Sequence, residues 1–95
     1  MPVVVRIHVK VMGAGVALEN MQVELYQGRF EPVPGPLVQA VVTNTQGMAE
    51  LDVEAGTYGF WVRALKMDAQ WQYDGPTRYT FREDQELRIY MSPAY

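Results

Sequence analysis

Thr43–Val62, TNTQGMAELDVEAGTYGFWV, is the stretch of sequence that decides the fold class. Two glycines, Gly47 and Gly56, divide it into a turn, a short strand of alternating apolar residues, a second turn and a longer aromatic strand. Glycine suits both turns because it adopts a positive φ without the strain that a side chain would suffer. Short strands that follow one another through tight turns are typical of an antiparallel β-sandwich.

The same alternation extends over the rest of the chain, beginning with PVVVRIHVKV at Pro2–Val11. A period of two indicates strands with one buried face. The sixth strand is interrupted by Asp74-Gly75-Pro76, because proline cannot donate to a ladder. Strands are expected at 3–11, 21–25, 37–43, 48–53, 57–66, 70–82 and 86–91. We therefore predict one all-β domain over residues 1–95, a seven-stranded antiparallel Greek-key β-sandwich of the Ig-like kind.

Alternation also assigns the two faces of each strand. Val4 and Val41 are expected on outer faces, and Trp61, Arg63 and Leu65 lie opposite the buried face of the strand at 57–66. The inward rows are expected to be Val3, Val5, Ile7, Val9 and Val11; Ala49, Leu51 and Val53; Tyr58, Phe60, Val62 and Ala64; and Leu87, Ile89 and Met91.

Composition excludes several classes of function. The 95 residues carry a net charge of −3 and no basic run, which disfavours binding to nucleic acid or to an anionic membrane. No cysteine is present, so disulfides, zinc–thiolate sites and thiol chemistry are excluded. No segment approaches the roughly 20 apolar residues of a membrane span. The N-terminal segment does not have the pattern of a secretion signal, so a complete chain is expected in the cytoplasm or in a particle assembled there.

The alternating first strand and four further motifs resemble those of the transthyretin-like sandwiches, which include the carboxypeptidase regulatory-like domains and the Cna B-type repeats of bacterial surface proteins. The four further motifs are a small loop followed by a strand at Val16–Leu25, the turn TNTQG at Thr43–Gly47, the strand start Ala49-Glu50-Leu51, and AGTY at Ala55–Tyr58, where the family has Pro-Gly-x-Tyr. The resemblance covers most of the chain. It implies a transthyretin/Cna B-like fold, and it implies little about function because this fold has many roles.

Two chemical activities of similar folds do not match these residues. Hydroxyisourate hydrolases use two or more histidines and a C-terminal Tyr-Arg-Gly-Ser, whereas this chain has one histidine, His8, and ends in MSPAY. Many Cna B-type domains join a first-strand lysine to an acid or amide of the last strand. Lys10 lies on the expected strand, but Leu87–Met91 contains no such partner. We therefore predict no catalytic residue and no enzyme activity.

The acidic residues Glu50, Asp52 and Glu54 alternate along one strand and its exit. A calcium site needs several converging oxygens, and a solvated strand face explains these three residues more simply. We predict no metal site and no cofactor.

What remains is a group of apolar and aromatic residues near one half of the chain. A cluster of this kind often marks an interface, although Trp61 and Trp71 could equally fill the ends of the sandwich. If Trp61 lies on an outer face, the change Trp61→Ser should remove association and leave stability nearly unchanged. The candidate interface residues are Trp61, Leu65, Trp71, Tyr73, Tyr79 and Tyr90.

The favoured function is a structural or assembly module that contacts copies of itself or a larger protein. Phage particles and contractile injection particles are settings for small sandwiches of this kind, by analogy of fold. The alternative is a carbohydrate-binding or adhesive module, in which Trp61, Trp71 and Tyr73 would stack on sugar rings of a glycan and Gln72 or Asp74 would bind hydroxyls.

Overall fold

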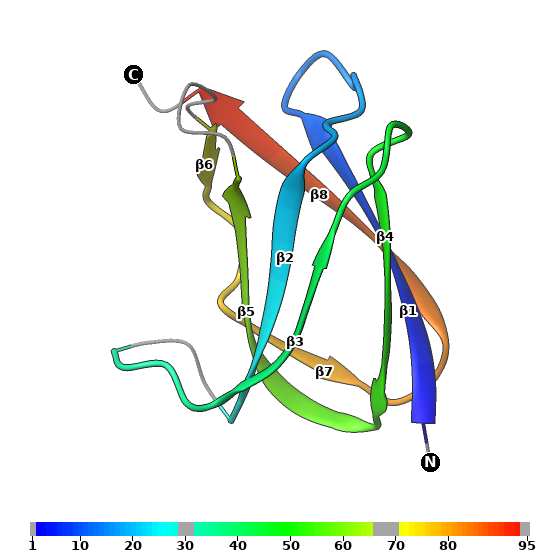
Figure 1. The fold of residues 1–95 in the computed structure, drawn as a ribbon, viewed down its shortest axis with the longest axis vertical. Coiled ribbons are helices and arrows are strands. Elements are labelled where there is room, and N and C mark those ends of the chain that lie inside the picture. The colour runs from blue at the N-terminus through cyan, green and yellow to red at the C-terminus, as the bar shows by residue number, and fades with distance from the viewer. Residues whose placement is uncertain (1, 29–31, 66–70, 94–95) are drawn as a thin grey trace.

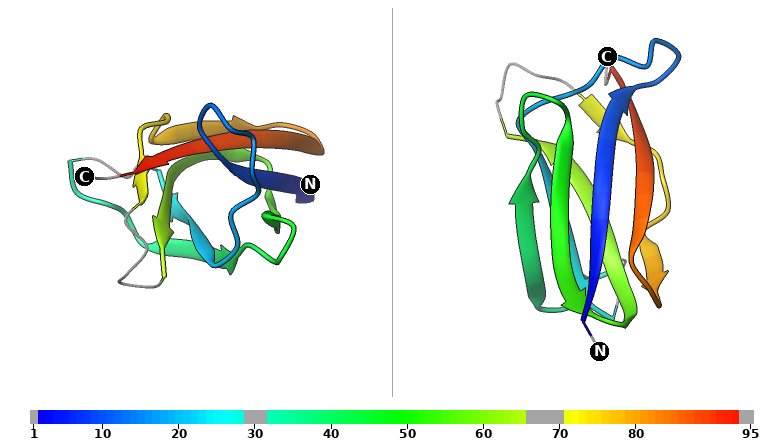
Figure 2. Two further views of the ribbon diagram at one scale, coloured as in Figure 1. Left: turned by 90° about the horizontal axis from the view of Figure 1, so that it is seen from above. Right: turned by 90° about the vertical axis from the view of Figure 1, so that its right-hand side faces the viewer.

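A computed structural model describes residues 2–28, 32–65 and 71–93. It contains two four-stranded sheets, ordered β4-β1-β8-β6 and β3-β2-β5-β7, which pack face to face (Figures 1 and 2). No helix in these residues is long and apolar enough to cross a membrane. The strands are β1 (Pro2–Val11), β2 (Met21–Gln27), β3 (Leu37–Val42), β4 (Met48–Glu54), β5 (Gly56–Ala64), β6 (Trp71–Tyr73), β7 (Arg78–Phe81) and β8 (Gln85–Pro93).

The expected all-β sandwich is confirmed, but the prediction of seven strands is wrong. Position 70, the predicted start of the sixth strand, lies outside the described residues, and 71–82 contains two strands in different sheets, since β6 pairs with β8 and β7 pairs with β5. The chain crosses between the sheets at Asp74-Gly75-Pro76, where Pro76 has no N–H to donate. Just beyond the crossing, the carbonyl oxygen of Thr77 accepts a hydrogen bond of 2.9 Å from the Phe60 N–H, which anchors the chain to β5.

The expected antiparallel arrangement holds for every strand pair except one. β1 and β8 run parallel, in a register that places Ile7 beside Leu87 and Val9 beside Ile89. A parallel pair needs a long connection, and here nearly the whole chain connects the first strand to the last. Sequence alternation alone does not encode this direction, because a strand buries the same face whichever way its neighbour runs.

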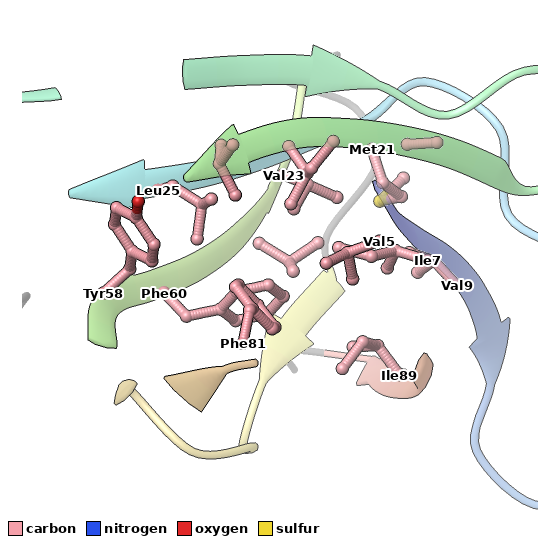
Figure 3. Close-up of a cluster of buried hydrophobic side chains, with 14 of the residues drawn as sticks. Val5, Ile7, Val9, Met21, Val23, Leu25, Tyr58, Phe60, Phe81 and Ile89 are labelled. Atoms are coloured by element: carbon pink, nitrogen blue, oxygen red, sulfur yellow. The ribbon is translucent and has the colours of Figure 1, made fainter. Parts of the chain in front are cut away.

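The core lies between the sheets and contains most of the predicted inward rows, together with residues of β2, β6 and β7, whereas Val11 is only partly buried (Figure 3). Ala64 and Leu87 are partly buried at its margin. The prediction that Val41 lies on an outer face is wrong. Val41 packs inward against the core, while Val38, Ala40 and Val42 are exposed. The largest fully buried side chains are Phe60, Phe81, Ile7, Leu25, Leu51 and Met91.

The two glycine turns of the opening stretch behave differently. Gly47 has a φ of +72°, and its N–H donates to the Asn44 carbonyl at 2.9 Å. The Asn44 Oδ1 accepts from two further backbone N–H groups, those of Gln46 and Met48, which stabilises the turn. Gly56 does not have a positive φ and begins β5 directly, so the expected strain at this glycine is not present.

Substitution of Gly47 should lower the free energy of unfolding more than substitution of Gly13. A Cβ at position 47 would lie 2.8 Å from the Val9 carbonyl oxygen and 2.9 Å from the Ala17 Cβ, whereas a Cβ at Gly13, with φ +84°, meets nothing within 4 Å. We expect Gly13→Ala to cost about 1 kcal/mol through φ alone, and Gly47→Ala to cost at least about 2 kcal/mol because the clash adds to it. Urea unfolding of both variants checks this; equal losses would contradict the close approach at Gly47.

Candidate interaction surface

The outer face of the β4-β1-β8-β6 sheet is charged. Along β1 the outward row is Arg6, His8 and Lys10, all at least partly exposed. The register places Arg6 between Glu50 of β4 and Glu86 of β8, and the His8 Nε2 lies 3.5 Å from a Glu86 carboxylate oxygen. Opposite charges on neighbouring strands favour a solvated sheet face.

The outer face of the β3-β2-β5-β7 sheet has a different chemistry. Its cross-strand rows run Val42–Gln22–Arg63 and Ala40–Glu24–Trp61. The apolar residues on β3 are open to solvent, with Val38 40% and Val42 44% exposed. The two outer faces are therefore chemically unequal: one carries many charges, and the other is mainly apolar on β3, with a polar cluster beside it.

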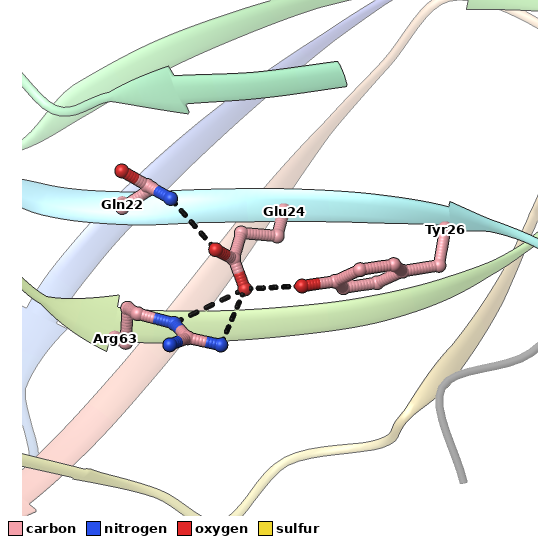
Figure 4. Close-up of polar contacts among 4 residues, drawn as sticks. All are labelled: Gln22, Glu24, Tyr26 and Arg63. Carbon is pink, nitrogen blue, oxygen red and sulfur yellow. Dashed lines mark hydrogen bonds and ion pairs between the residues drawn. The ribbon is translucent and has the colours of Figure 1, made fainter. Parts of the chain in front are cut away.

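Glu24 is the centre of that polar cluster (Figure 4). Although its side chain projects from the outer face of β2, the residue is only 5% exposed. Its Oε1 accepts from the Tyr26 hydroxyl at 2.8 Å and from Arg63 Nε at 3.1 Å, and it lies 2.9 Å from Arg63 Nη2. Its Oε2 accepts from the Gln22 Nε2 at 2.6 Å. Both carboxylate oxygens are thus bonded.

This bonding gives Glu24 a structural role. A carboxylate that is removed from water has to be paired and hydrogen-bonded, and the donors here come from both β2 and β5. The cluster also affects Tyr26, whose pKa is raised by burial first and then by the hydrogen bond to Glu24 and its charge. The pair of Glu24 and Arg63 therefore joins the two central strands of this sheet.

The four edge strands differ in how well they are protected. β6 has three residues and β7 has four. β4 is longer, but Glu50, Asp52 and Glu54 are exposed along it. β3 has six residues, LVQAVV, without a charge. Charged side chains and short length are the usual means of blocking strand addition, and β3 has neither.

The predicted interface residues are only partly brought together. Tyr73 is 5% exposed and belongs to the core, where its hydroxyl donates to the Pro76 carbonyl oxygen. Its ring meets Phe60 at 5.8 Å and Trp61, edge to face, at 5.2 Å between ring centroids. Tyr79 packs edge to face on Phe60 at 4.9 Å. These aromatics fill the side of the sandwich where the chain crosses between sheets.

Trp61 is consequently held by packing, and the expectation that Trp61→Ser would leave stability unchanged is not supported. The other three predicted residues differ in their surroundings: Trp71 is partly buried beside Pro93, Leu65 is exposed just after β5, and Tyr90 is exposed on the opposite sheet. Sequence reasoning did not identify Val38, Val42 and the Glu24 cluster. The uncharged run Leu37–Val42 was the available signal for β3.

The residues that could take part in chemistry do not converge on one site. In the part of the chain that the structure describes, no three or more histidine, cysteine or acidic side chains lie close enough together to hold a metal ion. Lys10 lies beside Tyr90 in the register of β1 and β8, and no acid or amide of β8 stands opposite it. His8 contacts Glu86 on the charged outer face, where both side chains are partly exposed.

Comparison with known proteins adds a fold likeness. No family model matches the chain, and no curated protein matches it. Among solved structures the chain is similar to the Bacillus anthracis TIE protein, with a TM-score of 0.69 and 16% sequence identity. The match covers 97% of this chain and 17% of that chain, so the chain corresponds to one part of a much longer protein. At this identity the likeness shows the fold alone.

Replacing the Glu24 carboxylate should destabilise the sandwich. Glu24→Gln keeps the shape of the side chain but removes its charge and replaces one acceptor oxygen with an NH₂ donor. That donor would face the donors of Gln22, Tyr26 and Arg63 and could not bond to them. We expect a loss of about 2 kcal/mol in the free energy of unfolding, measured by denaturant titration. The matched control is Glu50→Gln on the charged face, expected within about 0.5 kcal/mol of wild type. Equal losses in the two variants would contradict the role of the cluster.

Alkaline pH should weaken the fold through Tyr73. Burial raises the pKa of the Tyr73 hydroxyl well above its ordinary value of 10.0, and the charge of Tyr79 adds to the rise. Above that ordinary value the unfolded chain loses the proton while the folded chain keeps it, so stability falls as pH rises. Tyr73→Phe should reduce this slope by about 1.4 kcal/mol per pH unit. Urea midpoints measured at several alkaline pH values check it, and identical slopes would contradict it.

Proposed function

We propose that this domain is a non-enzymatic structural or assembly module, with a transthyretin/Cna B-like Greek-key sandwich as its scaffold. The resemblance of the motifs at 16–25, 43–47, 49–51 and 55–58 supports the family assignment. The distribution of strands also supports it, because the chain passes from β1 to the opposite sheet and returns with β4.

One observation carries the functional part of the proposal. The β3-β2-β5-β7 sheet ends in an uncharged, exposed edge strand, whereas the longest competing edge, β4, carries three exposed carboxylates. Exposed apolar groups on an unprotected edge favour contact with another polypeptide. A protein partner is therefore favoured over a soluble ligand, and a component of a larger particle is the setting that the fold analogy suggests.

A carbohydrate-binding or adhesive module is the competing function. It needs aromatic rings open for stacking on sugars. Tyr73 is buried, and Trp61 is partly buried and packs edge to face with Tyr73. Gln72 and Asp74, the polar groups proposed for sugar hydroxyls, are hydrogen-bonded to one another at 2.5 Å. These contacts favour the protein partner.

The solution mass of the domain tests the proposal. Light scattering over a wide range of concentration should show a species larger than the monomer. Val42→Glu should disperse that species, because it places a charge on the apolar outer row of β3. Glu50→Gln, on the charged face, serves as the control and should leave the larger species intact. A strict monomer whose tryptophan emission shifts with glycans would replace the assembly role with the carbohydrate-binding one.

A further inference from the structure

The backbone of β3 has hydrogen-bonding groups that β2 does not use. The Thr43 N–H donates to the Met21 carbonyl at 2.9 Å, so Thr43 faces β2. In an antiparallel pair, alternate residues face the neighbour, which turns the backbone groups of Ala40 and Val42 toward the free edge. Val38 is the extra residue of the irregularity between Leu25 and Tyr26, and no β2 residue stands opposite it.

The free edge of β3 is also accessible. β3 and β4 meet at the turn that joins them and separate toward the other end of the sandwich (Figure 1). An open groove lies between them, and its lining includes Val38, Gln39, Asp52 and Tyr58. Within this groove the Gln39 Oε1 is buried, and no residue in the described part of the chain donates a hydrogen bond to it.

We propose that β3 pairs with β3 of a second copy of this chain, antiparallel and about a two-fold axis at Ala40. This inference rests on the assembly role proposed above and names the partner. The axis places Ala40 opposite itself and Val38 opposite the partner's Val42, so each exposed valine is covered by another. It also brings the two Gln39 side chains onto a diagonal, within reach for long side chains, so that each amide can donate to the other's Oε1.

The distribution of charge favours pairing between two β3 strands over pairing between two β4 strands. The chain has a net charge of −3, so two copies repel wherever acidic residues meet. A β4–β4 pair would set Glu50, Asp52 and Glu54 against the same residues of the partner. In a β3–β3 pair no charged residue of one β3 strand stands opposite another. The pair closes as a dimer, because a two-fold contact uses the same surface on both subunits.

Ala40→Pro tests the contact without breaking the fold. The N–H of Ala40 points to the free edge, so proline removes a donor that β2 does not need, and edge strands tolerate proline in this position. Sedimentation velocity should show a dimer for the wild type and a dissociation constant raised at least about tenfold for Ala40→Pro. The melting midpoint checks that the variant is folded. If it is not, the cysteine variants below, which keep the backbone donor, decide whether the pairing exists.

Single cysteines test the register, because the chain has none of its own. Under mild oxidation Ala40→Cys should form a disulfide-linked dimer alone, and Val38→Cys should link only when mixed with Val42→Cys. Asp52→Cys on β4 is the control and should not link. A dimer with a different linking pattern overturns this pairing and leaves the assembly role standing. A strict monomer without a glycan response overturns the second copy as partner, whereas a monomer that responds to glycans overturns both.

Discussion

The rest of the structure depends on one constraint: each strand has to bury alternate side chains against the opposite sheet. With a period of two, satisfying the inner rows fixes which residues remain outside. Val5, Ile7 and Val9 belong to one core with Leu25 and Phe60, so the residues between them in each strand are placed on the outer faces. A thin sandwich of this size gains most of its stability from that core, so the outer faces are free to differ in chemistry. They do differ: one sheet carries charges, and the other carries exposed valines beside an ion pair in which the Glu24 carboxylate is buried and Arg63 is exposed.

The aromatic residues show how the ends of such a core are closed. β7 pairs with β5 only at Gly56–Gly59, which leaves the second half of β5 without a paired strand on the side opposite β2. The crossing at Asp74-Gly75-Pro76 places β6 there instead, so that Tyr73 covers Phe60 and meets Trp61. The aromatic side chains that the sequence predicted to form an interface therefore cover the part of β5 that no further strand covers. Because these aromatic side chains are packed, the exposed apolar surface of this sheet lies at its other edge, on β3.

Much of the fold was predictable because local signals agreed with the global one. The inward rows of β1, β4 and β5 follow from alternation, and the turn at Gly47 follows from its sequence. The parallel direction of β1 and β8 and the division of 71–82 between two sheets did not follow, since both depend on neighbours that are distant in sequence. The same limit applies to the site. Glu24 and Arg63 are 39 residues apart, and only the β2–β5 register shows that the carboxylate is buried and bonded.

The Glu24 cluster and the β3 edge have opposite relations to water, although they are neighbours on one sheet. A buried carboxylate is tolerated only when its lone pairs are filled, and here both oxygens accept hydrogen bonds. One strand away, Val38 and Val42 remain exposed, and the backbone groups beside them are not used by β2. The carboxylates of β4 protect its edge, and the pairing proposed above accounts for the lack of charged residues on β3. An edge that is covered in the assembled state needs no charge, and a charge there would prevent the strand addition that covers it.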